Sequence, residues 1–263
     1  MTEEEKVLSE FYGAYDEDGR LATRHGSVEF LTTMRYVKKY LRTGDRVLEI
    51  GAGTGRYSHA LAREGYRVDA VELVPHNIEI FKRNTREGER VTVTQGNALD
   101  LTAFADGSYD ITLLLGPMYH LYTAETQLKA LSEAIRVTKK GGTVFVAYCG
   151  NDATIVRFCF MKGKLKEERY KNLVDPVTFK AASSPAEVFA LHRREEIDDL
   201  MKGFSVQRLH FVGTDMATDY MSGVVDEMDD DFFNTYLNYH FSICERQDLV
   251  GASNHFLDVF KKL

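Results

Sequence analysis

The feature that most constrains this chain is a turn with glycine at three alternate positions, Gly51, Gly53 and Gly55, directly after the apolar run Val47 to Ile50. Glycine adopts positive φ values and lets the backbone approach a ligand closely. The helix that the sequence predicts after this turn would present free N–H groups at its first turn. A strand, a glycine turn and a helix in this order therefore predict a ligand site at the edge of a sheet.

Short β-branched runs alternate with amphipathic stretches from about residue 46 to residue 148. This alternation is typical of βαβ units and predicts a parallel sheet. The predicted strands in this part are Arg46 to Ile50, Arg67 to Glu72, Val91 to Gln95, Tyr109 to Leu115 and Thr143 to Tyr148. Further on, similar patterns predict strands over Phe204 to Val212 and His255 to Phe260.

A helix is predicted between the fourth and fifth strands. Thr123 is a residue type that caps helices. Leu128, Leu131 and Ile135 follow it at the spacing of one helix face. The helix is expected to end over Lys139 to Gly142, because cations and glycine favour a helix C-terminus.

The sequence is less regular after Gly150. Here it predicts an extended piece over Val188 to Leu191 and a helix from about Arg194 to Lys202, since one helix through both would put apolar residues on opposite faces. Residues 151–192 and 213–250 do not fit the alternation of strands and helices. Because they are aromatic and charged, we expect them to cover the sheet rather than to form a second domain.

The glycine spacing also separates two classes of nucleotide-binding site. The dinucleotide fingerprint GxGxxG would need a glycine where this chain has Arg56, so a nicotinamide dehydrogenase is disfavoured. Glu72 ends the second predicted strand, 21 residues after Gly51. An acidic side chain at that strand end suits the two hydroxyls of a ribose.

The segment Glu49 to Gly55 resembles motif I of the class I S-adenosylmethionine-dependent methyltransferases, which reads E/DxGxGxG. Gln95 to Ala98 stands where that family usually has GDA, and the amide oxygen of Asn97 can still accept the hydrogen bond that the usual acid accepts. Leu115 to His120 stands where the family's substrate-facing loop begins. Leu249 to His255 resembles the segment before an antiparallel last strand.

The resemblance implies a Rossmann-like α/β fold with a seven-stranded, mostly parallel sheet, helices on both faces and an antiparallel last strand. A helical cover would be inserted after the fifth and sixth strands. The whole chain, 1–263, would then be a single methyltransferase domain. Its core would be formed by about 40–150, 194–212 and 249–263, and its cover by about 1–39, 151–193 and 213–248.

The implied cofactor is S-adenosylmethionine, whose methyl group would pass to an oxygen, nitrogen or carbon nucleophile of a small molecule. The implied cofactor-binding residues are Glu49, Gly51, Ala52, Gly53, Thr54, Gly55, Glu72, Leu73, Asn97, Ala98, Leu115 and Gly116. Tyr119 and His120 are the candidate catalytic residues, because a histidine with a reference pKa of about 6.5 can accept a proton at neutral pH. The alternative is that His120 only packs against the next helix.

The aromatic and polar residues near the N-terminus, Tyr12, Tyr15, Arg24 and His25, resemble segments that fold over the cofactor in this family. Decoration of a surface helix is the other interpretation. The acids between residues 226 and 231 lack metal-binding spacing, so we expect a solvated loop and no metal site.

The formal net charge of −7 disfavours a nucleic-acid partner and a membrane surface, because phosphates attract basic proteins. The widely spaced cysteines have no metal-binding pattern and are expected to be free thiols in a reducing compartment. Together with the lack of an apolar leader, they predict a cytoplasmic protein.

Three other functions stay open at this point. One is an RNA or protein methyltransferase, which the acidic charge disfavours. Another is a transferase of aminopropyl groups, whose family usually has paired acids where this chain has Gly116-Pro117. The third is a module or scaffold that binds the cofactor without turnover.

Overall fold

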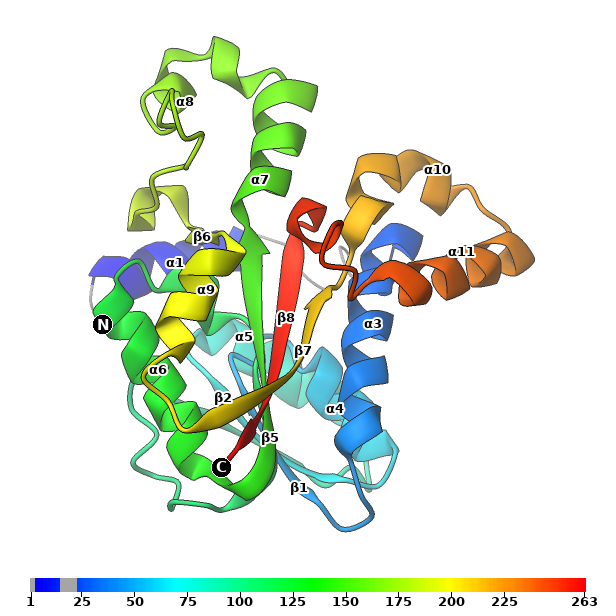
Figure 1. Ribbon diagram of the computed structural model, residues 1–263. Coiled ribbons are helices and arrows are strands. Elements are labelled where there is room, and N and C mark those ends of the chain that lie inside the picture. The colour runs from blue at the N-terminus through cyan, green and yellow to red at the C-terminus, as the bar shows by residue number, and fades with distance from the viewer. Residues whose placement is uncertain (1–2, 15–22) are drawn as a thin grey trace.

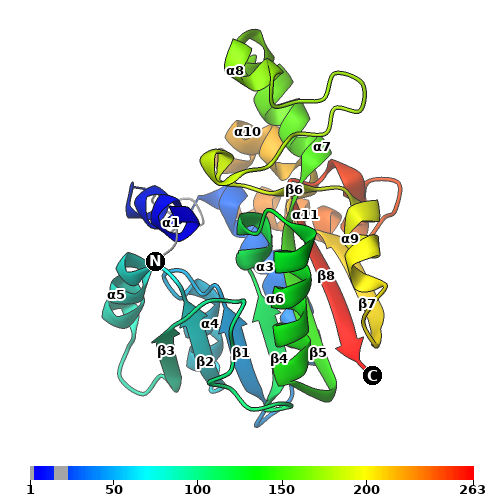
Figure 2. The ribbon, with the colours of Figure 1, turned by 90° about the vertical axis from the view of Figure 1, so that its left-hand side faces the viewer.

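The computed structural model describes residues 3–14 and 23–263. Its centre is a twisted sheet in the order β3-β2-β1-β4-β5-β8-β7, with the short β6 paired to β5 (Figures 1 and 2). The strands are β1 (Arg46–Ile50), β2 (Arg67–Glu72), β3 (Val91–Gln95), β4 (Tyr109–Leu114), β5 (Thr138–Gly150), β6 (Leu191–His192), β7 (Val206–Gly213) and β8 (His255–Lys262).

The strand directions confirm the predicted fold class. The neighbours from β3 to β5 pair in parallel, whereas β8 is antiparallel to both β5 and β7. The two-residue strand β6 is an addition to the seven expected strands. The chain order reverses between β1 and β4, and ligands of open α/β sheets bind beyond the carboxyl ends of the strands at such a reversal.

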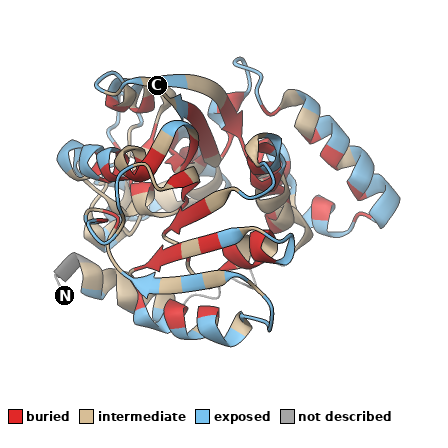
Figure 3. Cartoon of the chain, turned by 90° about the horizontal axis from the view of Figure 1, so that it is seen from below, coloured by how far each residue is buried: buried red, intermediate tan, exposed pale blue. Residues whose placement is uncertain are grey.

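Helices cover both faces of this sheet, as predicted. Buried residues of α3 (Arg24–Tyr40) and α4 (Arg56–Arg63) pack on one face together with Val47 of β1. Residues of α6 (Ala124–Val137) and α9 (Arg194–Met201) pack on the other face together with Leu48 of β1. Successive side chains of a strand point to opposite faces, so β1 contributes to both cores. Figure 3 shows the buried residues along the strands and the inner sides of the helices.

The prediction for α6 is correct at its start and wrong in two other respects. Thr123 caps the helix by accepting a hydrogen bond from the N–H of Thr126. The helix ends at Val137, however, and Lys139 to Gly142 belong to β5, whose pairing with β4 is irregular there. Leu128 is exposed. The buried face is instead Gln127, Ala130, Leu131, Glu133, Ala134 and Val137.

The cover consists of segments that rise from the site edge of the sheet (Figure 1). The N-terminal helix is α1 (Glu3–Ala14). After β5 come α7 (Asn151–Thr154), the π-helix Ile155–Met161 and α8 (Glu168–Lys171). After β7 come α10 (Ser222–Asp226) and α11 (Asp230–Ile243). Across the described residues, no helix combines the length and the apolar character that crossing a membrane requires.

The predicted extended piece over Val188 to Leu191 is wrong at its first residue. Val188 has a φ of 68° and follows the short 3-10 helix Pro185–Glu187, so the chain turns there. Extended pairing begins only at Leu191. The carbonyl of Val188 instead accepts a hydrogen bond from the Tyr122 hydroxyl at 2.7 Å.

Candidate functional site

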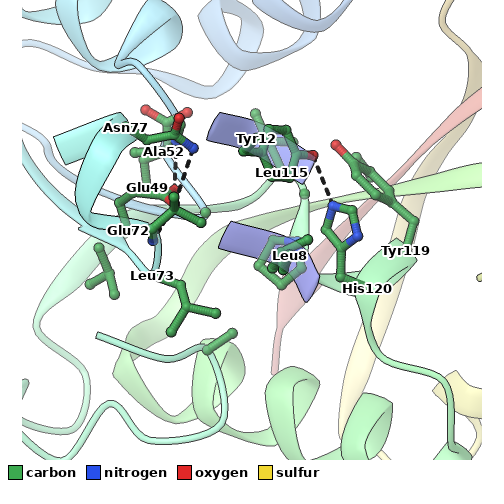
Figure 4. A pocket seen from close by; sticks show the side chains of 18 of the residues that line it. Leu8, Tyr12, Glu49, Ala52, Glu72, Leu73, Asn77, Leu115, Tyr119 and His120 are labelled. Atoms are coloured by element: carbon green, nitrogen blue, oxygen red, sulfur yellow. Dashed lines mark hydrogen bonds between the residues drawn. The ribbon is translucent and has the colours of Figure 1, made fainter. Parts of the chain in front are cut away.

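A cavity of about 250 Å³ lies beyond the carboxyl ends of β1, β2 and β4, at the reversal in strand order. It gathers the two predicted catalytic residues, Tyr119 and His120, and eleven of the twelve predicted cofactor residues. These eleven are Glu49, Gly51, Ala52, Gly53, Thr54, Glu72, Leu73, Asn97, Ala98, Leu115 and Gly116. Figure 4 shows the two acids on one side of the pocket, Tyr119 and His120 on the other, and Leu8 and Tyr12 of α1 between them. Gly55 does not line the cavity.

The glycines of the turn have different reasons to be glycine. A Cβ atom on Gly51 would lie 2.5 Å from Cδ of Pro117, and one on Gly55 would lie 2.5 Å from the Phe81 ring. All three glycines have positive φ values. No described atom lies within 4 Å of a Cβ on Gly53, which borders the cavity. Packing thus requires Gly51 and Gly55, whereas Gly53 leaves room in the pocket.

Glu72 ties the glycine turn to the end of β2. One carboxylate oxygen accepts the N–H of Gly53 at 2.8 Å, and the other accepts the N–H of Val74 at 2.8 Å. The side chain is buried, and burial raises its pKa although these hydrogen bonds lower it. The oxygen that accepts from Val74 also accepts from the Asn77 amide at 3.4 Å, so the lone pair left for a ligand hydroxyl is on the oxygen bound to Gly53.

Glu49 lies at the end of β1 below the turn and is almost fully buried. It accepts a short hydrogen bond from the hydroxyl of Ser58 on α4. Burial raises the pKa of Glu49 to about 8, so the carboxyl is mostly protonated at pH 7. A cation placed in the cavity would favour its ionised form.

Asn97 connects the cavity to the N-terminal helix. Its amide nitrogen donates to the Glu5 carboxylate at 3.1 Å, and its amide oxygen accepts the N–H of Leu99 at 3.0 Å. The amide oxygen therefore keeps one lone pair for a ligand. Helix α1 lies over the pocket through Glu5, Leu8 and Tyr12, whereas Tyr15 lies outside the described residues.

His120 is held by hydrogen bonds at both ring nitrogens. Nδ1 donates to the Val188 carbonyl at 3.0 Å, which leaves Nε2 to accept the hydroxyl of Tyr12 at 2.9 Å. Burial lowers the pKa of His120 to about 4. The reference pKa of about 6.5 does not apply in this environment, because a buried imidazolium loses hydration. His120 is thus a neutral group at pH 7.

A second, larger cavity of about 610 Å³ adjoins the first, because Tyr12, Glu29, Tyr119 and His255 line both. Its remaining walls come largely from the cover after β5. They are mainly apolar and aromatic, and include Ile155, Phe158, Tyr170, Leu173, Val174 and Phe189. The cover therefore encloses a space beside the cofactor-sized pocket.

A charged network at this shared wall was not predicted from the sequence. Nδ1 of His255 lies 2.6 Å from Asp215 Oδ2 and 3.5 Å from Glu29 Oε2. Asp219 lies nearby and pairs with Arg157 at 2.7 Å. Asp215, Asp219 and His255 come close enough to share a metal ion, but the ion pairs among these side chains already account for their grouping. No local spacing joins residues 40 positions apart, so only the fold reveals them.

Comparison with known proteins agrees with this geometry. Residues 47–142 match the model of a family described as a methyltransferase domain. The chain is 31% identical over 142 residues to a demethylmenaquinone methyltransferase of Clavibacter sepedonicus, covering 53% of this chain and 55% of that protein. It is 30% identical over 106 residues to an S-adenosyl-L-methionine-dependent Diels-Alderase, iccD, of Talaromyces variabilis, covering 39% and 35%. The chain thus spans about half or less of these curated relatives.

A similar solved structure is the geranyl diphosphate C-methyltransferase of Streptomyces coelicolor A3(2), in complex with Mg²⁺, geranyl diphosphate and S-adenosyl-L-homocysteine. The match has a TM-score of 0.61 and covers 100% of this chain and 99% of that chain, at 14% identity. At this identity the likeness shows the fold. Residues 47–142 thus match the methyltransferase-domain family, and the chain has the fold of S-adenosylmethionine-dependent methyltransferases.

Proposed function

We propose that this protein binds S-adenosylmethionine in the first cavity and transfers its methyl group to a small molecule in the second. The observation that carries the proposal is the convergence of the glycine turn, Glu49 and Glu72 on one pocket at the reversal in strand order. In this view the whole chain is one methyltransferase domain. The sheet and its flanking helices bind the cofactor, and the cover binds the acceptor.

The cofactor would lie across the glycine turn, with its ribose hydroxyls on Glu72 and its adenine near Asn97 and Ala98. The remaining residues of the predicted set, including Leu73, Leu115 and Gly116, would form the walls of the pocket. Methyl transfer from a sulfonium is an in-line displacement that needs no metal. The main contribution of the protein is alignment of the two reactants, which supplies roughly 7–11 kcal/mol in well-oriented reactions.

The acceptor would lie under the cover, with Tyr119 at the boundary between the two cavities. Tyr119 and His255 line both spaces, so a molecule in the second cavity meets the first cavity beside them. His120, which the Tyr12 hydroxyl and the Val188 carbonyl hold in place, would position the acceptor as a neutral polar group. The aromatic walls favour an acceptor with an apolar or planar body.

The net charge of −7 supports a small molecule rather than a nucleic acid as the partner. The three cysteines are free and buried, which supports a reducing, cytoplasmic location. A second function is favoured by one relative, whose name describes an S-adenosyl-L-methionine-dependent Diels-Alderase. In that case this chain would hold the cofactor without consuming it.

Incubation of the purified protein with S-adenosylmethionine labelled in its methyl group, together with a fractionated metabolite extract, tests the proposal. We expect a labelled small molecule, identified by mass, and one equivalent of S-adenosylhomocysteine. A Gly53→Val variant, whose side chain would occupy the cavity, serves as the control without cofactor. Label only in RNA or protein, or conversion of a metabolite without loss of the labelled methyl group, would contradict small-molecule methylation.

A further inference from the structure

Arg56 is an unpaired cation in the wall of the first cavity. It is the first residue of α4, and its guanidinium lies over the Phe30 ring at 4.7 Å. Its Nε atom is buried and has no hydrogen-bond partner, and no ion pair joins Arg56 to any acid within 3–14 and 23–263. A buried N–H group without an acceptor is costly, so the Nε of Arg56 calls for an acceptor, and the charge of the half-buried guanidinium favours an anionic one.

The surrounding charges make this cation distinctive. The acidic side chains that line the cavity are Glu5, Glu29, Glu49 and Glu72, of which Glu49 is mostly protonated at pH 7. Arg56 is the only Lys or Arg among the described lining residues. An acidic pocket of this kind would by itself favour the most cationic ligand available. Arg56 therefore provides a place in the pocket where a negative group is stabilised, whereas the other cationic group of the lining, His255, is already paired with Asp215 and Glu29.

The start of α4 adds to the same effect. Gly55 is the N-cap of this helix and offers no side-chain acceptor to the first N–H groups. The helix dipole at this end favours an anion. The guanidinium of Arg56 thus lies at the N-terminal end of α4, directly after the glycines.

The cofactor carries one negative group, the carboxylate of its methionine part. Asn97 contacts α1, whereas Arg56 packs on Phe30 of α3, and Glu72 binds the glycine turn between them. With adenine near Asn97 and ribose on Glu72, the methionine part extends toward Arg56. We propose, building on the function proposed above, that Arg56 binds this carboxylate and makes the pocket selective for S-adenosylmethionine over its decarboxylated form.

This selection separates two chemistries that share the fold. Decarboxylated S-adenosylmethionine is the donor in aminopropyl transfer, and it differs from the methyl donor in lacking this carboxylate. Without Arg56, the acidic side chains of the lining would favour the decarboxylated molecule, which has one more net positive charge. With Arg56, the carboxylate gains a charge-assisted contact that the decarboxylated molecule cannot make.

Calorimetric titration of the intact protein with three ligands tests this inference. The ligands are S-adenosylmethionine, its decarboxylated form and 5′-methylthioadenosine, which has neither the carboxylate nor the ammonium group. We expect the wild-type protein to prefer S-adenosylmethionine over the decarboxylated form by about tenfold or more. Arg56→Gln is expected to lose about tenfold in affinity for S-adenosylmethionine and to bind 5′-methylthioadenosine within about twofold of wild type.

Two further variants make the result specific. Arg56→Lys keeps the charge without the planar fork and should fall between wild type and Arg56→Gln. Arg63→Gln changes an arginine at the other end of α4, which pairs with Glu89 and does not line the cavity, and should leave all three affinities unchanged. Wild-type affinity for S-adenosylmethionine in Arg56→Gln, or an equal loss for 5′-methylthioadenosine, overturns the role of Arg56. Failure of the wild-type protein to bind any of the three ligands instead rejects the proposed function.

Discussion

The imidazole Nδ1 of His255 lies 2.6 Å from the carboxylate Oδ2 of Asp215 at the wall shared by the two cavities. The other oxygen of Asp215 accepts the hydroxyl of Ser253 and the N–H groups of Asn254 and His255. One acid thus fixes both the ring and the turn that precedes β8. Burial opposes the charge on His255, but Glu29 and Asp215 outweigh it and raise its pKa well above the ordinary value.

Replacing Asp215 should therefore lower the free energy of unfolding. His255, with its raised pKa, stabilises the fold fully below about pH 6.5 and loses this contribution as pH rises through the higher folded pKa. Asp215, with its lowered pKa, contributes above about pH 4 and loses this contribution as pH falls.

At pH 6, Asp215→Asn is expected to lower the free energy of unfolding by about 3–5 kcal/mol in urea titrations. Asp248→Asn, which removes an exposed ion pair, should leave the free energy of unfolding nearly unchanged. Equal effects of the two variants would contradict the buried pair.

Glu72 should control cofactor affinity. In Glu72→Ala both the ribose contacts and the bonds to the N–H groups of Gly53 and Val74 are lost, so we expect the Kd for S-adenosylmethionine to rise by about 10- to 100-fold. Glu72→Gln keeps one acceptor oxygen and should lose less. Glu79→Ala, on the exposed side of α5 (Pro75–Asn84), is the matched control. Calorimetry measures all three, and full affinity in a folded Glu72→Ala protein would show that this acid only shapes the turn.

The glycine turn predicts a stability difference between two similar variants. Gly55→Ala adds a Cβ against Phe81 and His59 at a φ of 93°, whereas Gly53→Ala adds one into open space at a φ of 54°. We expect both to lose about 1–2 kcal/mol from the positive φ, and Gly55→Ala to lose about 1–3 kcal/mol more from the collision. Denaturant titration without ligand gives the comparison. If Gly53→Ala is the less stable of the two, the packing argument is wrong.

Cofactor binding should release a proton from Glu49. Its pKa of about 8 lies above the unfolded value, so ionisation of Glu49 in the unfolded chain lowers the stability of the ligand-free protein as pH rises from about 4.5 to 8. A bound cation lowers this pKa, so affinity for S-adenosylmethionine should rise with pH up to about 8. At pH 7 the calorimetric enthalpy should then depend on the ionisation enthalpy of the buffer. Glu49→Gln should remove this dependence, and a buffer-independent enthalpy in the wild type would refute the proton release.

His120 and Tyr119 should affect turnover more than cofactor affinity. Once the acceptor is identified, we expect His120→Ala and Tyr119→Phe to lower kcat while the Kd for S-adenosylmethionine stays within about twofold, because both lie on the side of the first cavity opposite Glu49 and Glu72. With a pKa of about 4, His120 should add no pH dependence to kcat between about pH 6 and 8. Wild-type turnover in both variants would show that His120 and Tyr119 only contribute packing.

The sequence revealed the features that depend on neighbouring residues. The glycine turn and the acid at the end of β2 are local patterns, and the first three strands have the predicted bounds. The face of α6 was wrong because Gln127 and Glu133 are buried by specific bonds, to His192 and to the N–H of Leu101. Periodicity counts such polar residues as exposed. The apolar Leu128 was consequently assigned to the wrong side.

The parts that sequence could not predict depend on contacts between distant segments. His255 and Asp215 meet only because β7 and β8 pair, and Tyr12 reaches His120 across 108 positions. A reference pKa for His120 assumed exposure to water that the cover removes. Arg56 was visible in the sequence, but its lack of a partner is a property of the folded pocket.

The antiparallel direction of β8 has a consequence for how the cover can change. β7 ends at the site edge where β8 begins, and Gly213 pairs with Phe256. The segment between them, with α10 and α11, is therefore the loop of a long hairpin whose two ends are fixed side by side. Doubling the length of such a loop costs only about 0.6 kcal/mol in closure entropy. This part of the cover can accordingly grow or shrink without moving β7 and β8, and the cover after β5, which walls most of the second cavity, is not tied to its length.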